Sequence, residues 1–129
     1  MNKKNLIDTH AFLWFIDGNK ELSKTARLEI EAEGAINFIS IASLWEIAIK
    51  VSLGKLILNT DFNKINDKII QNGFEILAIT FEDTVEISSL PFHHRDPFDR
   101  IIIAQAITNN LTLISKDEHF SKYLSKIIY

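Results

Sequence analysis

The chain has 129 residues, of which 47% are hydrophobic, and this is the size and composition of one domain with a buried core. Its formal net charge of −3 argues against a protein that grips nucleic acid through a large basic surface, because such binding needs many Lys and Arg contacts to phosphates. Nucleic acid that is reached through metal ions is not excluded. The chain has no Cys, so disulfides and zinc–thiolate sites are excluded. We expect a single domain over residues 1–129.

Neither the N-terminus nor the most apolar stretch of the chain predicts an export or membrane segment. The N-terminus has two Lys but no apolar run long enough for a signal peptide. The most apolar stretch, residues 36–51, is interrupted by Asn, Ser, Glu and Lys side chains and is poor material for a membrane span. We therefore expect a cytoplasmic protein that does not enter a membrane.

The first half of the chain predicts two strands that alternate with helices. Short apolar runs at residues 5–7 and 36–39 are typical of buried strands. Ser23 is placed to cap a helix that lies between these strands. Ser40 follows the second strand and is placed to cap a helix that should stop near Gly54, because Gly favours helix ends.

The middle of the chain continues the alternation. Helical patterns at residues 61–71 and 80–89 lie on either side of a strand-like run at 74–79. Asp96 followed by Pro97 predicts a helix start, because Asp accepts from free N–H groups and Pro suits the first helical position. That helix should last until residue 109 or 110.

The last third adds two strands, at residues 111–114 and 126–129. Between them, Ser115 and Glu118 have the spacing of a capping box for a short helix. Strands that alternate with helices through short loops indicate an α/β fold, with a mostly parallel sheet covered by helices on both faces.

This topology brings four separate acids together. Asp8 ends the first strand and Asp117 lies just past the strand at 111–114, so both belong to the carboxyl edge of the sheet. Asp99 lies in the first turn of a helix that begins at the same edge, and Glu46 has a side chain long enough to reach back from the second turn of its helix. A cluster of carboxylates is a site for hard divalent cations, so we expect a metal site there.

Each acid taken singly also has an ordinary structural interpretation. A helix-capping or helix-end role is open to Asp8, Asp96 and Asp117, and the acid three residues after Asp96 fits the third helical position. Glu46 can form a surface ion pair with Lys50 one turn later. These roles do not explain why all four side chains converge on one edge, and the convergence favours the metal site.

Other candidate residues are weaker. His93 and His94 lie near an acid, but histidines in loops more often stabilise a turn than bind a metal. Trp14 and Trp45 lie among Leu and Ile residues, which favours packing in a core or interface over stacking on a base.

Four segments resemble the PIN-domain family, and more narrowly its VapC-type ribonuclease toxins. Residues 6–10, Leu-Ile-Asp-Thr-His, resemble the family's first strand and first acid, and residues 40–47 resemble the Ser-led helix that carries its Glu. Residues 99–106 resemble the helix that starts with the third acid, and 113–120 resemble the strand-to-loop segment of the fourth. The order and spacing of these segments extend the resemblance over nearly the whole chain.

The resemblance implies a PIN-like three-layer α/β/α sandwich around a mostly parallel sheet. It implies an endoribonuclease that depends on Mg²⁺ or Mn²⁺, acts as a toxin, forms a homodimer and has a small antitoxin partner. It also implies that the acids at the four matching positions hold the metal and are catalytic, namely Asp8, Glu46, Asp99 and Asp117. Asp96 is then a helix cap or a group just outside the ligands.

Residues next to these acids receive accessory roles as hypotheses. Thr9 and Ser115 can orient a carboxylate or a water molecule, and Arg100 or Lys116 can meet a phosphate, although a solvated surface role is equally open to both cations. Two rival functions are a non-catalytic interaction module with the same fold and a nuclease that processes DNA. All four acids are present, which disfavours the first rival.

Overall fold

A five-stranded parallel sheet forms the centre of the protein. The computed structural model describes residues 3–129, and its strand order is β3-β2-β1-β4-β5. Every neighbouring pair is parallel. The five strands predicted from the sequence are confirmed, with ends that differ by a few residues: β1 Lys4–Ile7, β2 Ile36–Ser40, β3 Glu75–Leu77, β4 Thr112–Ile114 and β5 Ile127–Ile128.

Helices fill the connections between the strands. Ser23, Ser40 and Asp96 accept hydrogen bonds from backbone N–H groups as the caps of α2, α3 and α6, as predicted. The α-helices are α1 Thr9–Asp17, α2 Lys24–Glu31, α3 Ile41–Ser52, α4 Ile65–Gln71, α5 Phe81–Ser89 and α6 Pro97–Thr108, and two 3₁₀-helices are η1 Phe62–Lys64 and η2 Glu118–Lys122.

The predicted capping box at Ser115 is wrong. The last helix is the 3₁₀-helix η2, and its N-cap is Asp117, whose side chain accepts from the backbone N–H of His119. Ser115 lies two residues earlier, and its hydroxyl oxygen accepts from the backbone N–H of Asp117. Ser115 therefore holds the turn that leads into η2 and does not cap the helix itself.

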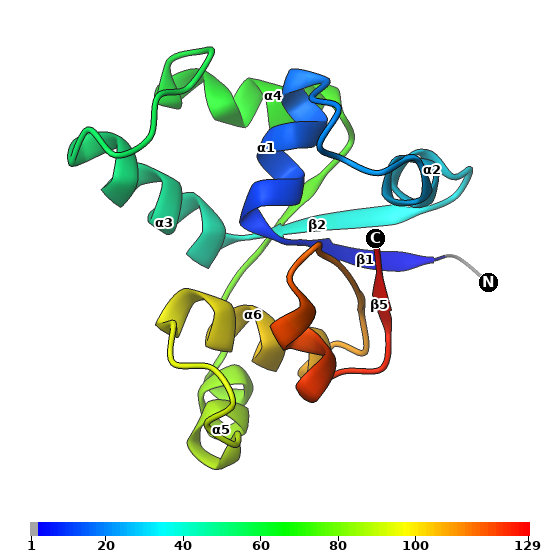
Figure 1. Cartoon of the computed structure of the whole chain (residues 1–129), viewed down its shortest axis with the longest axis vertical. Helices are drawn as coiled ribbons and strands as arrows, with labels where there is room; N and C mark the ends of the chain where they lie inside the picture. Colours follow the sequence, from blue (N-terminus) through cyan, green and yellow to red (C-terminus); the bar gives the residue numbers. More distant parts are fainter. Residues whose placement is uncertain (1–2) are drawn as a thin grey trace.

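The elements form three layers, and the predicted α/β/α sandwich is confirmed (Figure 1). In Figure 1, α1 to α4 lie on one side of β1 and β2, and α5, α6 and η2 lie on the other. Neighbouring residues of β1 point to opposite faces of the sheet, because side chains of a strand alternate in direction. Ile7 is buried in the core beside α1, α2 and α4, and Leu6 is buried in the core beside α6. Among residues 3–129, no helix is long and apolar enough to cross a bilayer.

The strand order places a topological switch point between β1 and β4. From β1 the chain builds the sheet outward through β2 and β3, then returns to β4 on the other side of β1 and continues to β5. The backbone N–H of Asp8 donates to the carbonyl of Ile114 at 3.0 Å, so the carboxyl ends of these two strands lie side by side. Connections that leave in opposite directions open a crevice there, which is where open α/β sheets bind ligands.

Candidate functional site

A crevice of about 120 Å³ lies at this edge of the sheet, and polar side chains dominate its lining. All four acids predicted from the sequence line it, together with Asp96, although they come from four separate segments of the chain. The lining residues are Asp8, Thr9, His10, Glu46, Lys50, Asp96, Asp99, Asp117 and Phe120.

Asp8 stands at the buried end of the crevice and is held by the backbone that follows it. Its Oδ1 accepts from the N–H of Ala11 at 2.8 Å, so Asp8 caps α1. Its Oδ2 accepts from the hydroxyl of Ser115, and Ser115 in turn accepts from the N–H of Asp117 at 3.0 Å. Ser115 thus links the acid after β1 to the acid after β4, which agrees with the orienting role expected for it.

Glu46 reaches the crevice from the second turn of α3 and is fixed at both oxygens. The hydroxyl of Thr9 donates to Oε1 at 2.7 Å, and the ammonium of Lys50 donates to Oε2 at 3.0 Å. The Thr9 hydroxyl also lies 2.9 Å from the hydroxyl oxygen of Ser43. Thr9 therefore orients Glu46, and the ion pair with Lys50 considered from the sequence is also present, although the Glu46 side chain is buried and not at the surface.

Asp96 and Asp99 both belong to the start of α6 but face different partners. Asp96 Oδ1 accepts from the N–H of Phe98 at 2.8 Å and from that of Asp99 at 3.3 Å, which makes it the N-cap. The Asp99 carboxylate instead lies beside the imidazole of His94, with Oδ2 at 2.7 Å from Nε2.

Burial changes the proton affinity of two of the acids, Asp8 and Asp99. Burial raises the pKa of Asp8 above its ordinary value, although hydrogen bonds from Ser115 and Ala11 act in the opposite direction. Burial, together with the negative charge of Asp96, raises the pKa of Asp99 to about 6, and the imidazole of His94 opposes this only in part. Both acids therefore resist ionisation unless a positive charge compensates them.

Asp117 is the outermost of the four acids and behaves differently. Its partial burial acts to raise its pKa, but the backbone and ring N–H groups of His119 and the nearby imidazole of His94 outweigh burial and lower the pKa. The Nδ1 atom of His119 lies 2.9 Å from Asp117 Oδ1. Asp117 is thus ready to offer a charged oxygen to the crevice.

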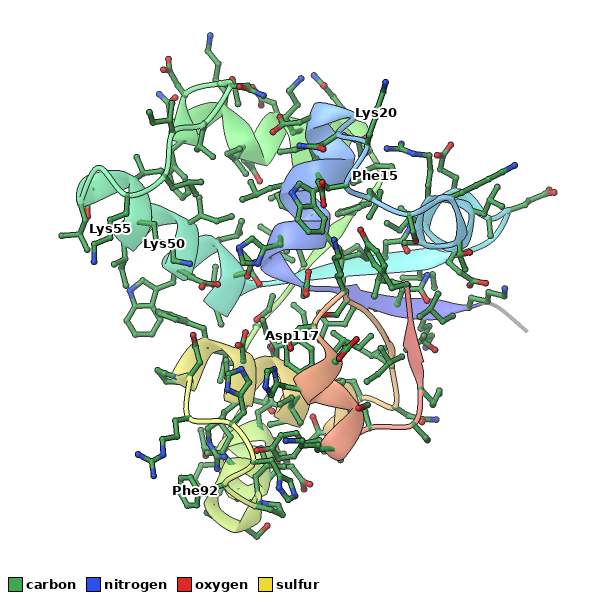
Figure 2. The ribbon with its side chains drawn as sticks, in the orientation of Figure 1. Phe15, Lys20, Lys50, Lys55, Phe92 and Asp117 are labelled. Atoms are coloured by element: carbon green, nitrogen blue, oxygen red, sulfur yellow. The ribbon has the colours of Figure 1, made fainter. Side chains whose placement is uncertain are left out.

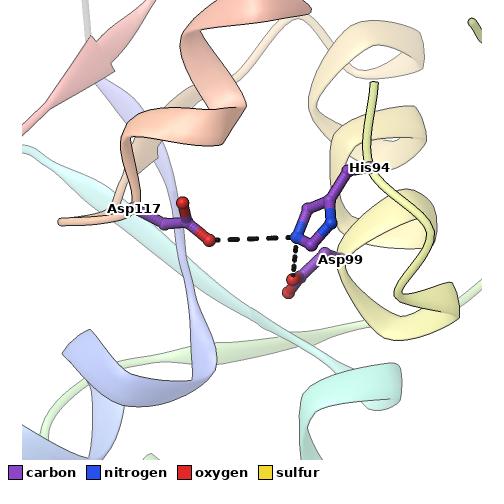
Figure 3. A group of neighbouring side chains, drawn as sticks. All are labelled: His94, Asp99 and Asp117. Carbon is purple, nitrogen blue, oxygen red and sulfur yellow. Dashed lines mark ion pairs between the residues drawn. The ribbon is translucent and has the colours of Figure 1, made fainter. Parts of the chain in front are cut away.

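His94 brings a nitrogen next to the acids. The sequence favoured a turn-stabilising role for it over metal binding, and its Nε2 lies 2.7 Å from Asp99 Oδ2 and 3.9 Å from Asp117 Oδ2 (Figure 3). These three side chains offer one atom each within 4.8 Å of one another, a group that can hold a metal ion. Its position five residues before Asp99 was the available signal in the sequence.

Arg100 does not serve the phosphate contact considered from the sequence. It is buried, and its two terminal nitrogens donate to the backbone carbonyls of Leu90, Pro91 and His94. Lys116 is exposed but pairs with Glu21 at 3.1 Å. Arg100 thus supports the loop before α6.

The donor atoms of the crevice suit a hard divalent cation. Carboxylate oxygens predominate, and such cations prefer oxygen ligands. The burial that raises the pKa of Asp8 and of Asp99 adds a reason for a cation, because a nearby positive charge restores the ionised form. The residues present therefore fit the metal that the sequence led us to expect.

Comparison with known proteins identifies the family. The family description of the PIN domain matches residues 6–124. The chain belongs to the PIN domain family. No curated protein sequence shows significant similarity to this PIN domain.

Solved structures share the fold of this PIN domain. VapBC2 from Rickettsia felis, bound to a DNA fragment from its promoter, has a TM-score of 0.69 at 19% identity, covering 98% of this chain and 97% of that one. A toxin–antitoxin complex from Klebsiella pneumoniae has a TM-score of 0.66 at 18% identity, with coverages of 97% and 96%. PAE2754 from Pyrobaculum aerophilum has a TM-score of 0.56 at 15% identity, with coverages of 99% and 91%. At these identities the likeness shows a common fold.

The raised pKa of Asp99 predicts how the stability of the metal-free protein depends on pH. Asp99 binds its proton more tightly in the folded state than in the unfolded state, so protonation of Asp99 stabilises the fold. This stabilisation is complete below the ordinary pKa of about 4 and is lost as the pH rises through about 6. We expect Asp99→Asn to remove this loss, which is on the order of 2 kcal/mol. Urea unfolding in chelator between pH 4 and 7 measures it, and parallel curves for the two proteins would contradict the prediction.

Asp96 and Asp99 should differ in what they do for stability. Asp96→Ala removes the cap of α6 and should lower the free energy of unfolding by about 0.5–2 kcal/mol. Asp99→Asn removes a partly buried charge and should leave the metal-free protein at pH 7 equally or more stable. The same urea experiment compares both variants at pH 7. Full stability of Asp96→Ala would show that the cap is dispensable.

Proposed function

We propose that this PIN domain is an endoribonuclease that depends on Mg²⁺ or Mn²⁺ and acts as the toxin of a toxin–antitoxin pair. The observation that carries the proposal is the convergence of four acids from four segments on one crevice at the switch point. Membership of the family supports it, because PIN domains are generally nucleases. The four acids are Asp8, Glu46, Asp99 and Asp117.

These four carboxylates would hold the cation and serve as the catalytic residues. When bound, Mg²⁺ or Mn²⁺ lowers the pKa of a coordinated water and stabilises negative charge on a phosphate. The chain's own residues set the direction of the ligands: Thr9 holds Glu46 and Ser115 holds Asp8 through hydrogen bonds. Preorganised ligands need no rearrangement when substrate arrives, which favours catalysis.

Helix ends support the same chemistry. Asp8 and Asp96 cap α1 and α6, so the N-termini of both helices face the crevice. The positive end of a helix favours a nearby anion by about 0.3–1 kcal/mol at a surface. Part of the repulsion among the acids is thereby offset, and the same ends can favour a substrate phosphate.

The toxin role and its partners come from the relatives. Two of the structures with the same fold are described as VapBC2 and as a toxin–antitoxin complex, which supports a small antitoxin as partner of this chain. A homodimer, which the sequence resemblance implied, and the cytoplasmic location expected from the sequence complete the proposal.

Trp45 marks a surface suited to a protein partner. It is 60% exposed, packs edge-on against Phe98 and borders an apolar hollow of about 300 Å³ between α3, α5 and α6. Large exposed apolar surfaces of this kind usually mark interactions. Trp14, for which the sequence favoured a core or interface, packs against the core and is less suited to this role.

Cleavage assays test the nuclease and separate it from its rivals. Single-stranded RNA should be cut in Mg²⁺ or Mn²⁺ and not in chelator. Asp99→Asn and Glu46→Gln should each lower the rate about 100-fold or more, because each removes part of the charge that holds the cation. Asp67→Asn, the same change at an exposed position of α4, should retain the wild-type rate.

The substrate decides between the alternatives in that assay. Cleavage of DNA in preference to RNA of the same sequence would make the protein a DNA-processing nuclease. Cleavage of neither, by folded protein with metal present, would make it a non-catalytic interaction module.

Expression in cells tests the toxin role. Induction of the wild-type chain should stop growth, Asp99→Asn should not, and co-expression of a small protein from an adjacent gene should restore growth. Viable counts after induction measure the effect. Normal growth with a wild-type protein that cleaves RNA in vitro would refute the toxin role and leave the nuclease standing.

A further inference from the structure

The loop between α5 and α6 is fixed so that it presents His94 to the acids. From inside, Arg100 Nη1 donates to the carbonyls of Pro91 and His94 at 2.9 and 3.1 Å, and Nη2 donates to that of Leu90 at 3.0 Å. Phe92 covers the guanidinium, with its ring centroid 4.3 Å away, and lies at the surface near α5 (Figure 2). Three hydrogen bonds from one buried charged group hold a loop more firmly than neutral bonds would.

A second side chain fixes the same loop from η2's end. The hydroxyl of Tyr123 accepts from the backbone N–H of His94 at 2.7 Å and donates to the carbonyl of Pro91 at 2.8 Å. The backbone N–H and carbonyl of His94 are thus both bound by side chains. The position of the His94 backbone is therefore set by the fold, and its imidazole lies against the rings of His119 and Phe120.

The imidazole places a nitrogen beside two carboxylates. His94 Nε2 is shielded from solvent and lies 2.7 Å from Asp99 Oδ2. Asp117 Oδ2 lies 3.9 Å from the same nitrogen, and Figure 3 shows both carboxylates beside it. One atom from each of His94, Asp99 and Asp117 lies within 4.8 Å of the other two, which is close enough for all three to hold one cation.

We propose that His94 Nε2 is a further ligand of the cation, beside Asp99 and Asp117, and that it makes the site select Mn²⁺ over Mg²⁺. The inference rests on the proposed function, because it concerns the cation of the same crevice. Mg²⁺ favours sites made of oxygen atoms and retains several waters, whereas imidazole nitrogen suits transition metals. A nitrogen in the ligand set therefore adds more to the affinity for Mn²⁺ than to the affinity for Mg²⁺.

A competing role for His94 makes the opposite prediction. If the imidazole served as a resident positive charge that takes the place of the cation, it would have to be displaced before a metal could bind. Removal of His94 would then strengthen the binding of both metals.

Metal titrations of the full chain decide between these roles. Mn²⁺ and Mg²⁺ are titrated separately into metal-free protein by calorimetry, and bound Mn²⁺ is followed by its electron paramagnetic resonance. His94→Ala should weaken Mn²⁺ binding by about tenfold or more, since losing a ligand should cost at least as much as losing a group that only orients one. The affinity for Mg²⁺ should change by less than about threefold, because Mg²⁺ prefers oxygen ligands and gains little from a nitrogen.

Two further variants keep the result interpretable. His94→Gln retains a polar side chain of similar reach but offers an amide oxygen in place of the imidazole nitrogen. It should therefore also lower the ratio of Mn²⁺ to Mg²⁺ affinity. Circular dichroism checks that each variant is folded. His93→Ala is the matched control, because His93 packs edge-on against Tyr123, is not one of the three side chains grouped around the proposed cation position, and should leave the ratio unchanged. Equal losses for both metals, no loss, or tighter Mn²⁺ binding in His94→Ala would overturn the proposal.

The same titrations separate this inference from the proposed function. Wild type that binds neither metal would contradict the metal-dependent nuclease itself. Wild type that binds both metals, together with an Asp99→Asn variant that binds neither and a His94→Ala variant like wild type, would overturn the role of His94 alone.

Discussion

The repulsion among carboxylates crowded at the ends of β1 and β4 is the constraint on which the structure of this PIN domain depends. Asp8 and Asp99 are withdrawn far enough from water that burial raises the pKa of each. Like charges at short range in such a setting cost free energy unless protons or cations neutralise them. The fold tolerates this cost because hydrogen bonds from Ser115, Thr9 and backbone N–H groups fix the acids in place. We infer that a bound divalent cation supplies the remaining compensation.

Fold and site are built from the same atoms. Asp8, Asp96 and Asp117 cap α1, α6 and η2, and all three also line the crevice. The sequence offered helix capping and metal binding as alternative roles for these acids, but the structure allows one acid to have both. The sheet order explains the coincidence, because every helix that starts at the carboxyl edge beside the switch point begins at the crevice. An acid at the N-cap of such a helix therefore lies at the crevice.

Local patterns in the sequence were sufficient to predict the strands, the caps of α2, α3 and α6, and the convergence of the four acids. They failed where a residue's role depends on distant partners. His94 owes its position to Arg100 and to Tyr123, which lies 29 residues away, and neither contact leaves a local pattern. Arg100 was misread for a related reason, since a charged residue in a helix gives no sign that loop carbonyls will bury it. Ser115 has the spacing of a capping box, but its hydroxyl donates to the Asp8 carboxylate and accepts from the backbone N–H of Asp117.

The central claim is that a cation relieves the charge crowding in the crevice. Its most direct measurement is the change in melting temperature between chelator and saturating Mg²⁺ or Mn²⁺, for wild type and for Asp8→Asn. In chelator the variant should melt at the same temperature as wild type or higher, because one buried charge is gone. Wild type should then gain more from the metal, since ligands that bind only the folded state stabilise it. Equal gains in the two proteins would contradict the account.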